Sequence, residues 1–220
     1  MKECIQIAID GPAVSGKSSA AKHLAQRLGY LYLDSGALYR AITLAVLRGF
    51  SLQGGDLELR LDQLELRLKP AEEGLGCRVF LKDEDVSQKI RTQHVTDHIR
   101  PISGSPEVRA WVVDFLQGAA KGQNVVMDGR DIGSVVFPSA RHKFFVTASM
   151  EVRVQRRLKD MDHHECLSSE QLTELLTQRD ESDRQRKIGP LIQAEDAILI
   201  DNSKLGLNET VDIMIAFITG

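Results

Sequence analysis

A glycine-rich segment near the start of the chain constrains the fold more than any other feature. Residues 11–18 read Gly-Pro-Ala-Val-Ser-Gly-Lys-Ser and match the pattern G-x-x-x-x-G-K-[ST]. The apolar run 5–9 precedes this segment, and residues 18–28 follow it with helical periodicity. A strand, a loop and a helix in this order are the context in which the pattern binds phosphate. The fold must therefore place one strand directly before a helix that begins at the loop.

The residues of this phosphate loop predict a nucleotide site. Glycines let the backbone wrap closely around phosphate oxygens, and the following helix directs its unpaired N–H groups toward them. Lys17 is expected to reach the terminal phosphates, and the Ser18 hydroxyl is expected to bind Mg²⁺. The residues expected to bind the nucleotide are Gly11, Pro12, Ala13, Val14, Ser15, Gly16, Lys17, Ser18 and Ser19. An ordinary glycine-rich turn between strand and helix is the structural alternative.

Short apolar runs recur along the chain and alternate with helix-like intervals. The runs are residues 5–9, 30–33, 125–127, 144–146 and 197–200. Helical periodicity is found in residues 18–28, 37–47, 106–120, 152–159, 168–179 and 208–218. Nearly continuous runs of Ile, Val, Leu and Phe are typical of parallel strands covered on both faces, so we expect a doubly wound α/β fold. Ligands of such folds bind beyond the carboxyl ends of the strands.

The interval between the second and third core strands is too long for a single crossover helix. Within it, residues 65–68 and 77–81 alternate polar and apolar side chains, and the turn-rich stretch 70–76 separates them. We expect a small antiparallel β insertion over about residues 64–92. With 220 residues, the chain is expected to be one domain with this elaboration.

Composition argues against several classes of function. The formal net charge of -3 gives no basic surface for nucleic acid, so any anionic ligand must be held by a local cluster. No apolar run approaches the ~18 residues that span a bilayer, and there is no secretory leader, so no membrane association is expected. The three cysteines are far apart and form no C-x-x-C pair, which favours reduced thiols in a cytoplasmic protein. We also expect a monomer.

Polar residues follow two of the expected strands and would face the same crevice as the phosphate loop. Ser35 and Arg40 come after the second strand, and as an alternative Asp34 or Ser35 could cap the helix that follows. Asp128 closes the third strand and is the expected second ligand of Mg²⁺. Arg130 and Asp131 follow a glycine and could bring a guanidinium and a carboxylate to one ligand. A self-satisfied ion pair or turn is the alternative.

The mixed-charge run 179–187 is a further basic cluster. On a helix, Arg179, Asp183 and Arg186 fall on one face, whereas Arg184 points elsewhere. A solvated charged face is the usual outcome of such a run. Beside a triphosphate site, however, phosphoryl transfer needs positive charge around the transferred group, which favours a functional role. The helix that follows the fourth strand adds Arg153, Arg156 and Arg157.

Taken together, these motifs resemble those of the bacterial cytidylate kinase family over nearly the full length of the chain. The matching segments are residues 7–18, 33–40, 85–87, 90–92, 106–109, 128–131, 135–138, 179–180 and 183–184. The resemblance implies an enzyme of pyrimidine nucleotide metabolism that uses ATP and Mg²⁺ to phosphorylate CMP and dCMP. It also implies a three-layer P-loop fold with a five-stranded parallel sheet. The core would comprise residues 1–35, 94–150 and 188–220.

The same resemblance implies how the remaining residues are used. Residues 36–93, with the β insertion, would form the monophosphate-binding region, and residues 153–187 would form a mobile lid, built in particular from 153–165. By position, the acceptor's phosphate would be bound by Arg40, Arg130 and Arg186, its ribose by Arg179 and Asp183, and its base by Ser35, Arg109 and Asp131. The residues expected to act in catalysis are Lys17, Arg130, Arg153, Arg157 and Arg184.

The chemistry of the base is consistent with these roles, and two positions depart from the family's pattern. A carboxylate can accept a hydrogen bond from the exocyclic amine of cytosine, whereas uracil would turn a carbonyl toward it. Val14 replaces the small Gly or Ser usual in the loop, which is tolerable if its side chain points outward. Arg100 lies nine residues before Arg109, where the family carries a serine that helps to bind the base. Arg100 either takes another ligand contact or swings away.

Other functions are compatible with a phosphate loop. A kinase for UMP, AMP or a hydroxylated metabolite would use the same donor chemistry. A switch that binds GTP is disfavoured because the chain has no N-K-x-D segment to read guanine. A nucleotide-binding module without catalysis is disfavoured by the set of Lys17, Ser18, Asp128 and clustered arginines.

Overall fold

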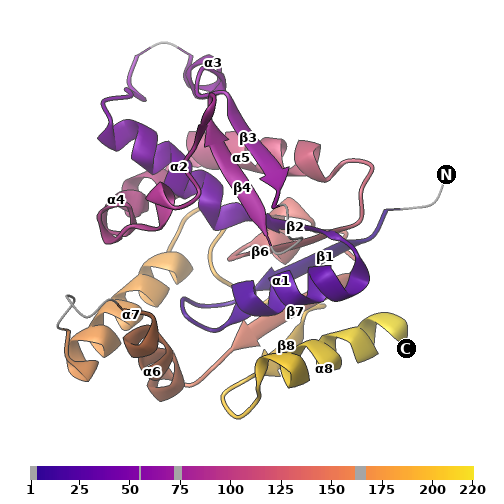
Figure 1. Ribbon diagram of the computed structural model, residues 1–220. Helices are drawn as coiled ribbons and strands as arrows, with labels where there is room; N and C mark the ends of the chain where they lie inside the picture. The colour runs from indigo at the N-terminus through magenta and orange to yellow at the C-terminus, as the bar shows by residue number, and fades with distance from the viewer. Residues whose placement is uncertain (1–3, 55, 72–75, 162–166) are drawn as a thin grey trace.

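A five-stranded sheet in the order β2-β6-β1-β7-β8 forms the centre of the computed structural model, which describes residues 4–54, 56–71, 76–161 and 167–220 (Figure 1). The strands are β1 Gln6–Asp10, β2 Leu31–Asp34, β6 Val125–Gly129, β7 His142–Thr147 and β8 Ile198–Asp201. All neighbouring strands are parallel, which confirms the expected doubly wound sheet. Because β1 is the middle strand, the loop after it opens at the middle of the sheet's carboxyl edge.

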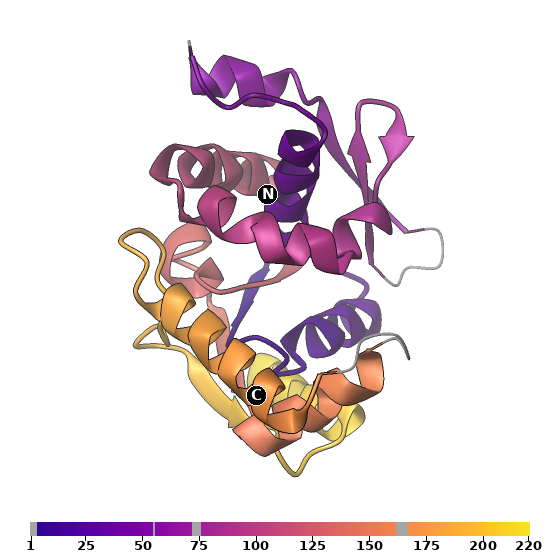
Figure 2. The ribbon, with the colours of Figure 1, turned by 90° about the vertical axis from the view of Figure 1, so that its left-hand side faces the viewer.

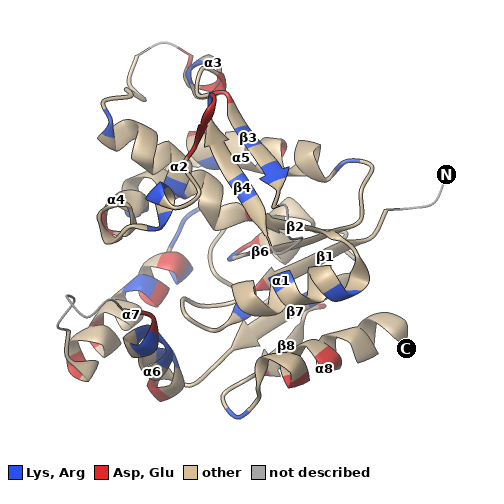
Figure 3. Ribbon diagram, in the orientation of Figure 1, with Lys and Arg blue, Asp and Glu red and all other residues tan. Residues whose placement is uncertain are grey.

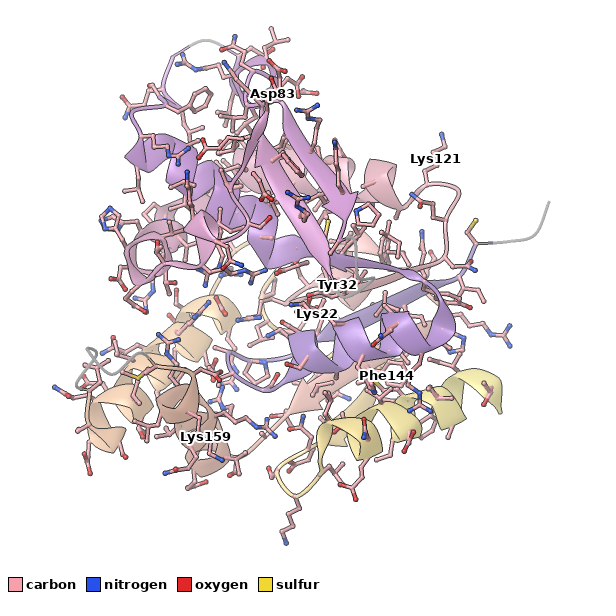
Figure 4. The ribbon with its side chains drawn as sticks, in the orientation of Figure 1. Lys22, Tyr32, Asp83, Lys121, Phe144 and Lys159 are labelled. Atoms are coloured by element: carbon pink, nitrogen blue, oxygen red, sulfur yellow. The ribbon has the colours of Figure 1, made fainter. Side chains whose placement is uncertain are left out.

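Helices cover both faces of this sheet, and each face has its own apolar core. On one face, Ile7, Ile9 and Phe144 pack against α1 Lys17–Leu28 and α8 Leu207–Thr219 (Figure 4). On the other face, the core is formed with α2 Ser35–Leu47 and α5 Pro106–Ala120. Successive residues of β1 alternate between the two cores, as strand geometry requires. Burial on both faces explains why the strands read as nearly continuous apolar runs.

The expected antiparallel insertion is present between α2 and α5. It consists of β3 Leu66–Pro70, β4 Cys77–Leu81 and the short β5 Glu84–Asp85, paired in that order. The helix α3 Leu57–Asp62 precedes this sheet and buries Leu61 in the core shared with α2. In Figure 1, β3 and β4 lie beside α2 and above α1.

Three elements between the insertion and β7 were not among the sequence expectations. The single turn η1 Lys89–Arg91 leads into α4 Gln93–Gly104, which packs against α2. Pro101 within α4 and Gly104 at its end weaken the helical signal of this stretch. The π-helical turn η2 Ile132–Val136 follows β6. Residues of α4 line the same cavity as residues at the carboxyl ends of the strands, so α4 lies beside that edge of the sheet. Figure 2 shows α4 between α2 above it and α1 below it.

Two helices, α6 Met150–Asp160 and α7 Ser169–Arg184, pack together below the phosphate loop. Their own small core joins Ala13 of the loop to Val154, Leu172 and Leu176. The helix expected over residues 168–179 corresponds to α7, which continues for five more residues and ends at Arg184. Residues 162–166 of the expected lid lie outside the described residues. Within the described parts of the chain, no helix is long and apolar enough to cross a membrane.

Candidate active site

A cavity of about 850 Å³ lies between the carboxyl edge of the sheet, α4 and α7. Arg and Lys residues are carried by α2, α6 and α7, which border this cavity (Figure 3). Most of the residues expected to bind nucleotide or acceptor contribute to its wall. The expected site residues that line the cavity, including Asp128 for the metal and Arg157 for catalysis, are Ala13, Val14, Lys17, Ser18, Ser35, Arg40, Arg109, Asp128, Arg130, Asp131, Arg157, Arg179, Asp183 and Arg186. Residues from six separate segments of the chain therefore meet at one place.

The phosphate loop occupies the turn between β1 and α1, as its sequence predicts. At Gly11 a Cβ would come within 2.0 Å of the Val146 carbonyl oxygen, so no larger residue fits without moving the backbone. Gly16 forms the N-cap of α1, which leaves the helix's first N–H groups at the loop. Such N–H groups together with the positive end of the helix dipole form a site for anions.

Val14 has a backbone conformation that favours glycine. Its φ of 59° lies in the left-handed region, where a β-branched residue is strained. The Val14 side chain is half-buried and packs against the small core of α6 and α7 rather than pointing away into solvent. The packing against this core explains how Val is accommodated in a conformation that favours glycine.

Lys17 lies at the floor of the cavity and is almost fully buried. Its ammonium donates a hydrogen bond to the Pro12 carbonyl oxygen, 3.1 Å away. Burial, together with the nearby charge of Arg130, lowers the pKa of Lys17 to about 7. A phosphate group beside the ammonium would favour its charged form and offset this penalty.

Asp128 is held by two hydroxyl groups. Ser18 Oγ donates to one carboxylate oxygen at 2.5 Å, and the Tyr32 hydroxyl donates to the other at 2.6 Å. Burial and the neighbouring Asp34 raise the pKa of Asp128. Tyr32 lies on β2 near Lys22 of α1 (Figure 4), whose ammonium is 5.7 Å from the ring centre. The pair formed by Ser18 and Asp128 offers hard oxygen ligands of the type that Mg²⁺ prefers.

Asp34, rather than Ser35, caps α2. The Asp34 carboxylate accepts a hydrogen bond from the Ala37 N–H at 3.1 Å and pairs with Arg91 at 2.5 Å. Burial alone would raise the pKa of Asp34, but Arg91 outweighs it and the net shift is downward. Ser35 Oγ instead donates to the Asp128 carbonyl oxygen at 2.8 Å. The capping alternative is therefore confirmed for Asp34 and wrong for Ser35, whose hydroxyl faces the carboxyl end of β6.

The residues expected to contact the acceptor form two groups of ion pairs. Asp131 pairs with Arg109, and burial raises the pKa of Asp131 despite that partner. Asp183 pairs with Arg130 at 2.7 Å and with Arg186. Burial alone would raise the pKa of Asp183, but Arg130 and Arg186 lower it overall. Arg130 and Asp131 thus pair with residues of other segments, and all five side chains also line the cavity.

Three more cations border the same space. Arg40 donates to the Ile90 carbonyl oxygen at 3.2 Å and to Thr96 Oγ1 at 2.8 Å. Within the described parts of the chain, the Arg179 side chain has neither a hydrogen bond nor an ion pair, and burial with nearby Arg130 lowers its pKa to about 10. The third cation, Arg157 on α6, donates across to the Gln93 side chain at the start of α4, at 2.9 Å. The helices α6 and α4 are thereby bridged over the cavity mouth.

Two of the expected catalytic residues are not part of the cavity wall. Arg153 is buried between the phosphate loop and α7, where it pairs with Asp180 at 2.6 Å and donates to the Ala13 carbonyl oxygen at 2.9 Å. Asp180 in turn accepts from the Ala13 N–H at 3.2 Å. Arg184, the last residue of α7, is exposed. Arg153 thus holds the loop's backbone in this structure, and Arg184 lies in solvent.

Sequence reasoning did not assign a role to several residues that support the site. Asp10, at the end of β1, accepts hydrogen bonds from the N–H groups of Ile132 and Gly133, both at 2.8 Å. Asn202, after β8, holds the Ser15 carbonyl oxygen at 2.9 Å. Like Asp128, Asp10 ends an apolar strand of the parallel sheet, so the reasoning that found Asp128 could have found Asp10.

Known proteins resemble this chain in sequence and in fold. A sequence model of the family described as cytidylate kinase matches residues 7–220. A cytidylate kinase from an Exiguobacterium strain is 44% identical over 219 residues, which are 96% of this chain and 95% of the relative. One from Caldanaerobacter subterraneus is 45% identical over 209 residues, 94% of this chain and 92% of the relative.

Solved structures with much lower sequence identity share the fold. A shikimate kinase from Bacteroides thetaiotaomicron matches with a TM-score of 0.51 at 13% identity, over 97% of this chain and 98% of that chain. An uncharacterized protein from Eubacterium ventriosum matches with a TM-score of 0.55 at 13% identity, over 98% of each chain. These two likenesses concern the fold alone.

Proposed function

Because the chain belongs to the cytidylate kinase family, we propose that it transfers the terminal phosphoryl group of ATP to CMP and dCMP, forming CDP and dCDP. One observation carries this proposal beyond the family name. The phosphate loop, with Lys17, and the arginines expected at the acceptor, Arg40, Arg130 and Arg186, line the same cavity. Donor and acceptor could therefore lie end to end with their phosphates between these cations.

The acceptor needs no strong general base in this reaction. Its phosphate monoester has a second pKa near 6, so at neutral pH an oxygen is already largely ionised. That oxygen attacks the terminal phosphorus of the donor, and the bond from this phosphorus to the bridging oxygen breaks. The protein's contribution is to hold the reacting oxygens in line and to neutralise charge, for which Lys17 and Arg130 are placed.

The residues at the loop also fit a magnesium ion. Ser18, at the start of α1, and Asp128, on the neighbouring strand β6, offer oxygen ligands beside the phosphate loop. Mg²⁺ is commonly bound by one or two protein groups with phosphate oxygens and water completing its shell. The charge neutralisation that it supplies to the phosphate oxygens would add to that of Lys17.

Base selection in our proposal rests on the pair of Arg109 and Asp131. The Asp131 carboxylate can accept from the exocyclic amine of cytosine, and Arg109 can donate to O2 and N3. Uracil would place a carbonyl oxygen against the carboxylate, and this mismatch at a buried position can lower the efficiency of transfer by orders of magnitude. We assign Ser35 to the same end of the cavity and Asp183 with Arg179 to the ribose.

Residues 153–187 are proposed to act as a lid over the donor, and residues 36–93 as the monophosphate-binding region. The hydrogen bond from Arg157 to Gln93 supports this division because it bridges the two regions across the cavity mouth. Closing the lid would exclude water, which otherwise competes with the acceptor. Arg153 and Arg184 remain proposed catalytic residues that lid movement would have to bring to the donor. We further propose that the protein acts as a cytoplasmic monomer, which light scattering would test.

The test is a panel of acceptors. Purified protein is incubated with ATP, Mg²⁺ and each ribo- and deoxyribonucleoside monophosphate, and ADP release is measured. We expect the highest kcat/KM with CMP and dCMP. Faster transfer to UMP, AMP or a hydroxylated metabolite would reassign the substrate. Hydrolysis without any acceptor would point to a nucleotide switch, and nucleotide binding without transfer to a binding module.

A further inference from the structure

One face of α4 forms a wall of the cavity, and its residues differ in depth along the helix. Thr96, Arg100 and Ser103 line the cavity at spacings of four and three residues, so they lie on the same face. Arg100 is exposed and also borders a shallower hollow outside the cavity, beside Gln178 and Glu181 of α7. Ser103 is only 4% exposed. Arg100 therefore lies at the rim of the cavity, and Ser103 at its floor.

The Ser103 hydroxyl is buried but poorly hydrogen-bonded. It donates to the Arg100 carbonyl oxygen at 3.4 Å and accepts from Arg186 Nη2, also at 3.4 Å. Both distances exceed the usual ranges of about 2.5–3.0 Å for O–H···O and 2.7–3.2 Å for N–H···O bonds. A buried polar group with weak partners is destabilising, so a ligand atom that offers a good hydrogen bond would bind it favourably.

The Ser103 residue also connects the two groups of ion pairs in the cavity. Its carbonyl oxygen accepts from Arg109 Nη1 at 3.1 Å, and Arg109 is paired with Asp131. Its hydroxyl meets Arg186, which is paired with Asp183. The hydroxyl thus lies between the residues proposed to read the base and those proposed to hold the phosphate and ribose.

We propose that Ser103 takes part in recognising the acceptor's base by donating a hydrogen bond to the polar edge of the pyrimidine. This inference rests on the proposed function and names a contact within the same site. Cytosine offers acceptors at O2 and N3, and a hydroxyl rotates freely enough to donate to either. Arg100, at the position of the family's usual serine, stays at the rim and makes no base contact. The serine one helical turn further along α4 supplies the hydroxyl instead.

Two single variants test this assignment by binding as well as by activity. Calorimetric titration measures the Kd of CMP and of ribose 5-phosphate, which has the same phosphate and sugar without the base. Ser103→Ala is expected to weaken CMP binding by between about threefold and tenfold, the value of one neutral hydrogen bond, and to leave ribose 5-phosphate unchanged. Arg100→Ser, the matched control on the same helix, is expected to change either Kd by less than about twofold.

Three results would overturn the assignment. Equal weakening of CMP and ribose 5-phosphate by Ser103→Ala would mean that Ser103 acts through Arg186 or the helix, not on the base. Unchanged CMP binding in Ser103→Ala, or a larger effect of Arg100→Ser, would remove Ser103 from base recognition. If the unaltered protein binds CMP but does not phosphorylate it, the proposed function fails and the Ser103→Ala comparison still decides this inference. If it binds no nucleoside monophosphate, both fail.

Discussion

Arg109 of α5 and Asp131 after β6 form an ion pair whose side chains are only 2% and 7% exposed. The Arg109 guanidinium also lies over the Tyr39 ring, 5.5 Å from its centre. The backbone of Gly189 covers the pair so closely that a Cβ there would come within 2.0 Å of Arg109 Nη2. A base that enters between these side chains must replace the hydrogen bond that Arg109 donates to the Asp131 carboxylate. Cytosine can do so at both ends, which makes the pair a filter for the acceptor.

Asp131→Asn is expected to reduce both selectivity and stability. Removing the carboxylate leaves the buried Arg109 without its charge partner, which costs about 3 kcal/mol in the free energy of unfolding. An amide can also donate to the carbonyl of uracil, so the ratio of kcat/KM for CMP to that for UMP should fall by at least tenfold. Urea unfolding and acceptor kinetics measure the two effects. Retained CMP preference in a correctly folded Asp131→Asn protein would remove Asp131 from base reading.

Lys17→Ala is expected to abolish most of the turnover without unfolding the protein. The ammonium lies against the phosphate loop, where it donates to the Pro12 carbonyl oxygen, and electrostatic groups of this kind contribute about 100-fold or more to kcat. Little stability should be lost, because burial already disfavours the charged form of Lys17. The thermal midpoint serves as the control for folding. Near-normal kcat in this variant would exclude Lys17 from the catalytic role.

Asp128→Asn should raise the Mg²⁺ concentration needed for half-maximal activity and lower kcat by about 100-fold. Tyr32→Phe is the matched control, because it removes the other hydroxyl that binds Asp128 but keeps the carboxylate. We expect this control to lose less than about fivefold in kcat. An unchanged Mg²⁺ dependence in Asp128→Asn would show that the metal is bound elsewhere.

Asp10 is expected to give stability a pH dependence. Burial raises the pKa of Asp10 to about 7 from an ordinary value of 3.8, although two backbone N–H groups donate to it. Between these values the folded state holds a proton that the unfolded state has lost, so stability falls as pH rises through this window. Compared with Asp10→Asn, the unaltered protein should therefore lose relative stability from pH 5 to pH 7 and level off by about pH 8. If the free energy of unfolding, measured with urea, changes with pH in the same way for the two proteins over this range, Asp10 does not have the raised pKa.

Arg153→Ala and Arg157→Ala should separate two roles of α6, the helix proposed to form part of a lid. Arg153→Ala leaves the buried Asp180 unpaired and should lower the free energy of unfolding by about 3 kcal/mol as well as raise the KM for ATP. Arg157 is less buried, so its removal should change stability by less than about 1 kcal/mol while lowering kcat. Full kcat in Arg157→Ala would argue against a lid contact to the donor.

The sheet and the phosphate loop could be predicted from the sequence because their signals are local. Strands buried on both faces need continuous apolar residues, and the loop needs glycines at fixed positions. The helix α4 was not predicted, because Pro101 interrupts its helical sequence pattern and because its stability comes from packing against α2. The strand β5 has only two residues, Glu84–Asp85, too few for any alternating pattern.

Many of the residues that line the cavity were predicted from the sequence, but their pairing was not. Strand ends identified Asp128 and Asp131, since parallel strands bring their carboxyl ends to one edge. No local pattern states that Asp131 pairs with Arg109 or that Asp180 pairs with Arg153, because these contacts join segments far apart in the chain. The depth of Ser103 in the cavity likewise depends on how α4 packs, which only the structure describes.

A crystal structure with CMP and a non-transferable ATP analogue tests the central claim most directly. We expect the analogue's phosphates on the loop at Lys17 and the CMP phosphate in contact with Arg40, Arg130 and Arg186, with its base between Arg109 and Asp131. The reacting phosphorus and oxygen should then lie within about 3.5 Å of each other. Those three arginines turned into solvent, with the second nucleotide bound elsewhere, would contradict the proposed transfer.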